Sequence, residues 1–270
     1  KAQKSGAQLE TVLIIFAVAM MIISLTCTRP LLGAIFGHVE ESVMESAILY
    51  FMVTSVSFPF LGLYNAGAAI FRSTGNSAIS MKISILMNII NVTGNAIFVF
   101  VCKWAVFGVA FATLLSRVAA GFAMTALVCG KTNPIRIKRM SEFKPDGGII
   151  RKILTIGIPS GIENGMFQIG KLSVTSMVST FGTASIAANS VGYTIIDFAN
   201  IPGSAMGLAL ITIVGQCIGA GDKQQAVSYT KKIIKFAYIG DWICNIVLFT
   251  FAGAISGIFN LSAEAHSIAI

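Results

Sequence analysis

The polar residues with the clearest chemical potential lie inside long apolar stretches of this 270-residue chain. The stretch IGIPSGIENGMFQIGKL, residues 156–172, holds Glu163, Asn164, Gln168 and Lys171. On a helix, the two amides and the lysine share one face, and the glutamate lies on the adjacent flank. Such a face can line a polar cavity in which Glu163 contacts an ion or a cationic substrate. The same residues could instead form a buried hydrogen-bond cluster that only joins helices.

Three further ionisable groups lie in apolar surroundings. Asp197, in VGYTIIDFANIPG, comes shortly before Pro202, and broken helices place ion sites in transporters. We therefore consider Asp197 a candidate ion or substrate contact, although it could equally be a structural partner of Lys171 or Arg117. For Arg117 and Asp241 we expect structural charge pairing.

A run of asparagines, NIINVTGNAIF, adds amides to this inventory. Asn91 and Asn95 are one helical turn apart and share a face, and Asn88 comes before them. Amides can bind a dehydrated cation or the polar groups of a substrate, but they carry no proton at ordinary pH. We expect Asn91 and Asn95 to contact an ion or substrate and Asn88 to line the cavity, unless all three only join helices.

The residues needed for catalysis or cofactor binding are missing from the sequence. It contains no Walker loop, no GxSxG and no His/Glu metal motif, and its five cysteines show no CxxC or metal-ligand spacing. We therefore expect neither an enzyme nor a bound cofactor or metal. Without a nucleotide-binding loop, any pumping must draw on an ion gradient, of H+ or Na+.

The composition indicates a membrane protein. Hydrophobic residues make up 55% of the chain and charged residues 11%, whereas about 25% are charged in soluble proteins. Alternating ten-residue strands are absent, so we predict an all-α polytopic membrane helix bundle. An eighth segment starts near Ala263, after seven apolar segments at residues 11–36, 44–71, 79–101, 105–129, 149–180, 184–218 and 230–258.

The distribution of basic residues predicts the orientation and explains the net charge of +8 without nucleic acid. The connections on one side hold only Arg29 and Lys103 as cations. The N-terminus therefore faces the cytoplasm, because the other connections hold the remaining loop cations: Lys1, Lys4, Arg72, Lys82, Lys131, Arg136, Lys138, Arg139, Lys144, Arg151, Lys152, Lys223, Lys231, Lys232 and Lys235.

The longest polar connection divides the chain. It runs from Lys131 to Asp146 and is the most basic stretch. A loose internal echo, in which the stretch from Pro30 resembles the stretch from Ala254, favours two repeated halves. We predict the later part of one lobe at residues 1–130, a cytoplasmic linker at 131–148 and the first part of a second lobe at 149–270.

Several motifs make the chain resemble the multidrug and toxic compound extrusion (MATE) transporters. They are SFPFLGLYNAGAAIFRSTGNSAISMKIS, the asparagine run followed by FGVAFATLLSR, the IGIPSGIEN opening, and IPGSAMGLALITIVGQCIGAGDKQQA. The resemblance implies a twelve-helix antiporter with two pseudo-symmetric six-helix lobes. It would export lipophilic, mostly cationic compounds in exchange for H+ or Na+. This chain would cover the third to ninth helices and the start of the tenth.

Two residues depart from the pattern of that family. One branch of the family has an aspartate where this chain has Asn95, so a proton mechanism centred there is not expected. Another branch has a glutamate about two turns after the proline of its seventh helix, whereas Glu163 follows Pro159 by four residues.

Our main hypothesis is a monomeric secondary exporter of lipophilic small molecules in a prokaryotic plasma membrane, working by alternating access. One alternative is a flippase for a lipid-linked oligosaccharide or cell-wall precursor. Another is a non-transporting membrane assembly or receptor subunit, which predicts that the charges inside the membrane pair fully.

Overall fold

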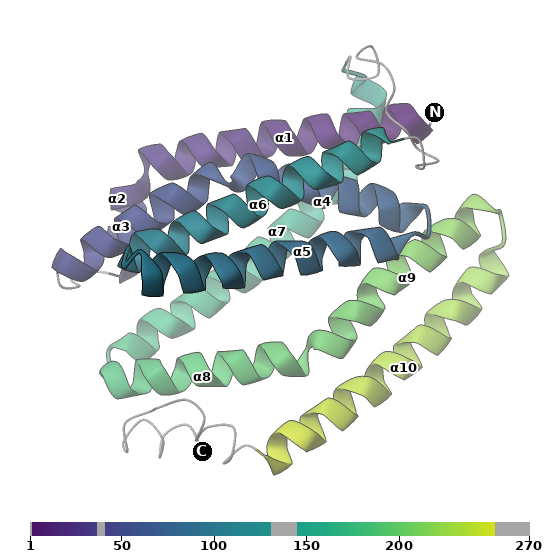
Figure 1. The fold of residues 1–270 in the computed structure, drawn as a ribbon. Helices are drawn as coiled ribbons and strands as arrows, with labels where there is room; N and C mark the ends of the chain where they lie inside the picture. The colour runs from purple at the N-terminus through teal and green to yellow at the C-terminus, as the bar shows by residue number, and fades with distance from the viewer. Residues whose placement is uncertain (1, 37–40, 131–144, 252–270) are drawn as a thin grey trace. The chain divides into compact units, whose positions relative to one another are not determined.

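The computed structural model describes residues 2–36, 41–130 and 145–251, and within these ranges every regular element is helical (Figure 1). The predicted segment near Ala263, the echo from Ala254 and most of the basic connection lie outside the described residues. The elements are α1 (Ala2–Thr26), α2 (Thr28–Phe36), α3 (Glu41–Val56), α4 (Phe58–Ser73), α5 (Ser77–Asn95), the π-helix η1 (Ala96–Val101), α6 (Ala105–Cys129), α7 (Gly147–Ser179), α8 (Thr183–Ala199), α9 (Ile201–Gly219) and α10 (Lys223–Thr250).

The all-α prediction is confirmed, and the helices overlap all seven predicted segments. Among the described helices, five are long and apolar enough to cross a membrane: α1, α5 together with η1, α6, α9 and α10. The pair α3 and α4, bent by 46°, is a sixth if it is counted as one span. The remaining segment, 149–180, forms α7, which is not among these candidate spans.

The chain divides into two compact units, Lys1–Ile162 and Glu163–Ile270. The division falls inside α7, close to Pro159, which lies within that helix. A proline inside a helix removes one backbone hydrogen bond and weakens the helix locally. The lobe boundaries at 130 and 149 stay a prediction, because most of the connection between them falls outside the described residues.

In the first unit, α1, α3, α4, α5 and α6 pack along one another (Figure 1). The core contains Phe71 of α4 and Met124 of α6. A Cβ atom on Gly67 would overlap Met124, and one on Gly121 would lie 2.7 Å from the carbonyl oxygen of Phe60. Small residues of this kind let helices approach closely in lipid, where van der Waals packing drives association.

The bend between α3 and α4 is held by a side chain of α6. Arg117 Nη1 donates to Ser57 Oγ at 2.8 Å, and Ser57 Oγ donates to the carbonyl oxygen of Thr54 at 2.5 Å. Pro59 lacks an N–H group, so the helical ladder is interrupted at this point. Arg117, for which we expected an acidic partner, is therefore bonded to a buried hydroxyl at a helix break.

In the second unit, α10 holds the break between α8 and α9. Asp241 Oδ1 accepts a hydrogen bond from the backbone N–H of Gly203 at 2.9 Å, at the N-terminus of α9. Cys244 Sγ lies 3.7 Å from the carbonyl oxygen of Phe198, which lacks its usual donor because Pro202 has no N–H. Asp241 thus bonds to backbone rather than to a basic side chain.

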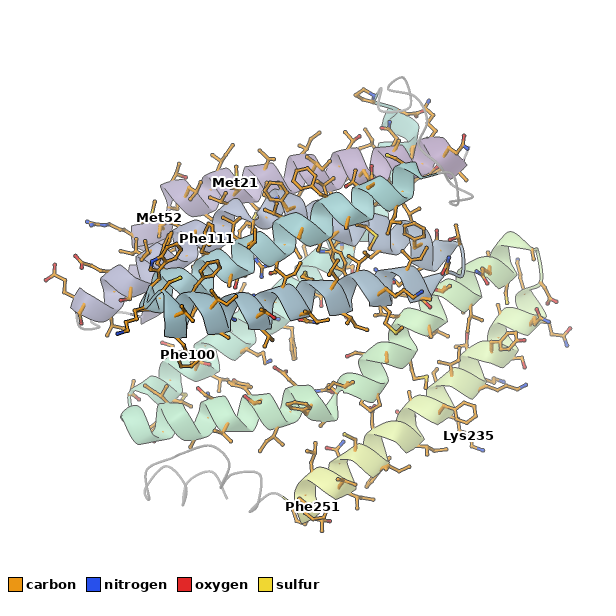
Figure 2. All side chains as sticks on the ribbon, in the orientation of Figure 1. Met21, Met52, Phe100, Phe111, Lys235 and Phe251 are labelled. Atoms are coloured by element: carbon orange, nitrogen blue, oxygen red, sulfur yellow. The ribbon has the colours of Figure 1, made fainter. Side chains whose placement is uncertain are left out.

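Large apolar side chains point outward from the helices of both units, as Figure 2 shows. Phe100 of η1 is 79% exposed, and Phe249 and Phe251 at the end of α10 are also exposed. Outward apolar side chains are expected when the surrounding solvent is lipid.

Candidate functional site

The first candidate site is an amide cluster in the first unit, made of Asn91, Asn95 and Thr113. Asn95 Nδ2 donates to Asn91 Oδ1 at 3.1 Å, and Asn91 Nδ2 donates to Thr113 Oγ1 at 3.3 Å. Thr113 Oγ1 donates to the carbonyl oxygen of Val109 at 3.0 Å. These bonds tie α5 to α6 and use most of the polar atoms of the cluster.

One oxygen of the amide cluster stays available. Asn95 Oδ1 is buried and has no hydrogen-bond partner, which costs about 1–3 kcal/mol if nothing binds it. The residue closes α5, directly before the π-helix η1, and π-helical turns are frequent at functional sites. The neighbouring Gly94 lets α6 come close, since a Cβ there would lie 3.0 Å from that of Ala112. Asn88, on the same helix, is exposed.

The second candidate site is a lysine–aspartate cluster in the second unit, made of Lys171 and Phe167 of α7 and Asp197 and Tyr193 of α8. Lys171 Nζ lies 3.4 Å from Asp197 Oδ1. It also lies 4.9 Å from the ring centroid of Tyr193 and 5.8 Å from that of Phe167. The Tyr193 hydroxyl reaches the carbonyl oxygen of Lys171 at 3.5 Å. Of the two basic partners that the sequence offered for Asp197, Lys171 is the one that lies beside it.

The other polar residues predicted on α7 are exposed in the described structure. Glu163, Asn164 and Gln168 are all on its surface. Glu163 precedes Lys171 by eight residues, or about 12 Å of helix, so it does not join the lysine–aspartate cluster. A groove of about 920 Å³ between α1, α4 and the start of α7 contains none of the predicted site residues.

Asp146, one of the residues that line this groove, joins the start of α7 to α1. Its Oδ1 accepts from the backbone N–H groups of Gly148 and Ile149, and its Oδ2 pairs with Lys4 Nζ at 2.5 Å. The hydrogen bond from Lys4 and the backbone N–H bonds hold the pKa of the Asp146 carboxyl below its ordinary value. The backbone N–H of Asp146 donates to Gln8 Oε1 at 3.1 Å.

Sequence reasoning missed several of these groups. Glu10 is only 2% exposed, and its Oε1 has no hydrogen-bond partner. We placed the first apolar segment from residue 11, whereas α1 begins at Ala2. The polar composition of KAQKSGAQLE made the helix start difficult to predict. The acid Glu10, directly before the apolar segment, could still have been recognised as a candidate buried group. Tyr193 and Phe167 could also have been identified from the sequence, because Tyr193 precedes Asp197 by four residues and Phe167 precedes Lys171 by four.

The charges inside the membrane segments are only partly paired. In the described ranges, Lys171 and Asp197 form an ion pair, whereas Arg117 is bonded to the Ser57 hydroxyl and Asp241 to the backbone N–H of Gly203. These residues therefore do not show the full pairing of charges that a non-transporting assembly predicts.

Comparison with known sequences identifies relatives along nearly the whole chain. The family model described as MatE matches residues 1–97 and 159–270. A probable multidrug resistance protein YoeA of Bacillus subtilis is 23% identical over 85% of this chain and 51% of its own length. A probable multidrug resistance protein NorM of Thermotoga maritima is 24% identical over 99% of this chain and 58% of its own length. The chain thus spans about half the length of the curated relatives it matches.

Solved structures share the fold. One is a MOP superfamily transporter from Pyrococcus furiosus, described as having a binding pocket of reverse polarity that suggests a different function. It has a TM-score of 0.87 at 21% identity, covering 99% of this chain and 65% of that one. Another is an outward-facing multidrug resistance MATE family transporter, with a TM-score of 0.86 at 20% identity, covering 99% of this chain and 64% of that one.

Proposed function

Since the chain belongs to the MatE family, whose members are transporters rather than enzymes, we propose that the whole protein is a secondary active exporter. It exchanges Na+ or H+ for lipophilic, mostly cationic compounds by alternating access. It acts as a monomer in a prokaryotic plasma membrane, with the N-terminus of this chain on the cytoplasmic side.

The observation that carries this proposal is the buried, unpartnered Oδ1 of Asn95. Together with Asn91 Oδ1 and Thr113 Oγ1 it provides neutral oxygen atoms within one cluster. Neutral oxygens can replace the hydration shell of a small cation, as carbonyl rings do in channels. Since none of these groups titrates near neutral pH, the amide cluster favours Na+ over H+ at this position.

The lysine–aspartate cluster supports a cationic rather than an anionic substrate. A lipid-linked pyrophosphate would need free cationic side chains, but Lys171 is neutralised by Asp197 and Arg117 is bonded at the α3–α4 bend. We therefore place export of cations ahead of the flipping of a lipid-linked precursor.

The test is transport by the full-length protein in proteoliposomes with a Na+ gradient as the only driving force. Asn95→Ala removes the unpartnered oxygen, and we expect it to abolish Na+-driven uptake of an organic cation. Thr93→Ala removes an exposed polar side chain from the same helix and is the matched control, expected to transport normally. Na+-driven transport that survives Asn95→Ala would refute the assignment of the amide cluster.

A further inference from the structure

The lysine–aspartate cluster surrounds an ammonium group in the way that a receptor surrounds an organic cation. A carboxylate oxygen lies 3.4 Å from Lys171 Nζ. The rings of Tyr193 and Phe167 lie within 6 Å of the same nitrogen. At such distances the electron-rich face of an aromatic ring attracts a cation, and aromatic rings around a cation are how proteins recognise quaternary ammonium groups.

Two helices build this arrangement with the same spacing. Phe167 precedes Lys171 by four residues on α7, and Tyr193 precedes Asp197 by four residues on α8. Residues four apart share a helix face, so each helix presents one ring and one charged group. The rings and the carboxylate would recognise any cation of suitable size, and in this structure the ammonium of Lys171 lies among them.

The contact is open to competition. The Asp197 side chain is 69% exposed and that of Lys171 is 28% exposed. An ion pair with an exposed carboxylate is weak, and the four-carbon stem of lysine is flexible. A ligand that brings its own positive charge and aromatic surface can therefore take the place of the ammonium.

We propose that Lys171 is a tethered competitor at a binding site for lipophilic aryl cations formed by Asp197, Tyr193 and Phe167, and that such a cation binds by displacing Lys171 from Asp197. This inference rests on the proposed export of cationic compounds and assigns the residues that receive them. Lys171 then sets the affinity of the site and helps release the bound cation, because its ammonium returns to Asp197.

The test uses the full-length protein in detergent and measures equilibrium binding of tetraphenylphosphonium, with tetraphenylborate as a probe of the same shape and opposite charge. Lys171→Met removes the ammonium but keeps the length of the side chain. We expect it to bind tetraphenylphosphonium about tenfold more tightly than the wild type, because Asp197 is left free and a like charge is gone. Neither protein is expected to bind tetraphenylborate more tightly than the cation.

Further variants separate the proposal from a general effect of charge. Lys232→Met is the matched control, because Lys232 also lies over a tyrosine ring, Tyr229 at 6.0 Å, but on α10; it should bind like the wild type. Asp197→Asn should weaken binding about tenfold or more, and Tyr193→Leu should weaken it severalfold. In an Asp197→Asn background, Lys171→Met should bring a smaller gain, because only the like charge is then removed. Lys171→Gln serves as a second variant if Lys171→Met does not fold.

The outcomes are distinct from those of the transport test. If Lys171→Met and Lys171→Gln bind the cation no more tightly than the wild type, or if no variant binds it, the proposal is overturned. The proposal is also overturned if Lys171→Met improves binding by the same factor in the Asp197→Asn background as in the wild type. A wild type that moves no compound under any ion gradient refutes the proposed function instead, whatever the binding data give.

Discussion

Replacing Gly203 with alanine should break the contact that holds the α8–α9 break. A Cβ at this position would lie 2.8 Å from Asp241 Oδ2 and 3.3 Å from Oδ1, so the carboxylate must move away from the Gly203 N–H. A hydrogen bond to a charged group contributes about 1.5–3 kcal/mol. We expect Gly203→Ala to lower the free energy of unfolding by that amount. The measurement is an unfolding titration with a denaturing detergent in mixed micelles.

The double variant makes this prediction specific. Asp241→Ala should cost about the same 1.5–3 kcal/mol, since the N–H of Gly203 then loses its acceptor. In that background Gly203→Ala should cost nothing further, because no carboxylate remains to be displaced. Gly207→Ala, one turn along α9 with nothing within 4 Å of the added Cβ, is the control and should be neutral or slightly stabilising. Strictly additive effects of the two changes would refute the reasoning.

Three further changes test charged groups in and near α1. Asp146→Asn should remove acid sensitivity: the Asp146 pKa is lowered from 3.8, so the contact with Lys4 stabilises the fold above that pH and is lost as the pH falls through the folded-state pKa. In this variant the free energy of unfolding should therefore depend less on pH below 3.8 than in the wild type, and Lys4→Met should have the same effect. An unchanged slope in both variants would count against the Lys4–Asp146 ion pair. Glu10→Met should raise the free energy of unfolding by about 1–3 kcal/mol, because it removes a buried oxygen without a partner. A loss of stability there would mean that the Glu10 carboxyl has a partner in the full-length protein.

The helices and the local side-chain clusters could be predicted because they depend on neighbours in the sequence. Apolar runs indicated where the spans lie, and the four-residue spacing of Asn91 and Asn95 placed them on one face. The Lys171–Asp197 pair was an alternative from the start, because two opposite charges in apolar surroundings have few other partners.

The remaining contacts depend on how one helix lies against another, which no pattern within a segment determines. Thr113 reaches Asn91 only through the packing of α6 on α5, and Ser57 becomes a partner for Arg117 only because the chain bends there. Glu10 was missed for a different reason, since polar residues at the start of α1 concealed nine residues of helix. The carboxylate of Asp241 could be predicted to be structural, but its backbone partner could not.

The most direct test of exchange uses no ion gradient at the start. Proteoliposomes holding the full-length protein would be loaded with tetraphenylphosphonium, diluted into medium with equal Na+ and equal pH on both sides, and followed with radioactive Na+ and a pH-sensitive dye under clamped membrane potential. Efflux of the cation should drive Na+ or H+ inward against its own developing gradient. Efflux that moves neither ion would contradict the account.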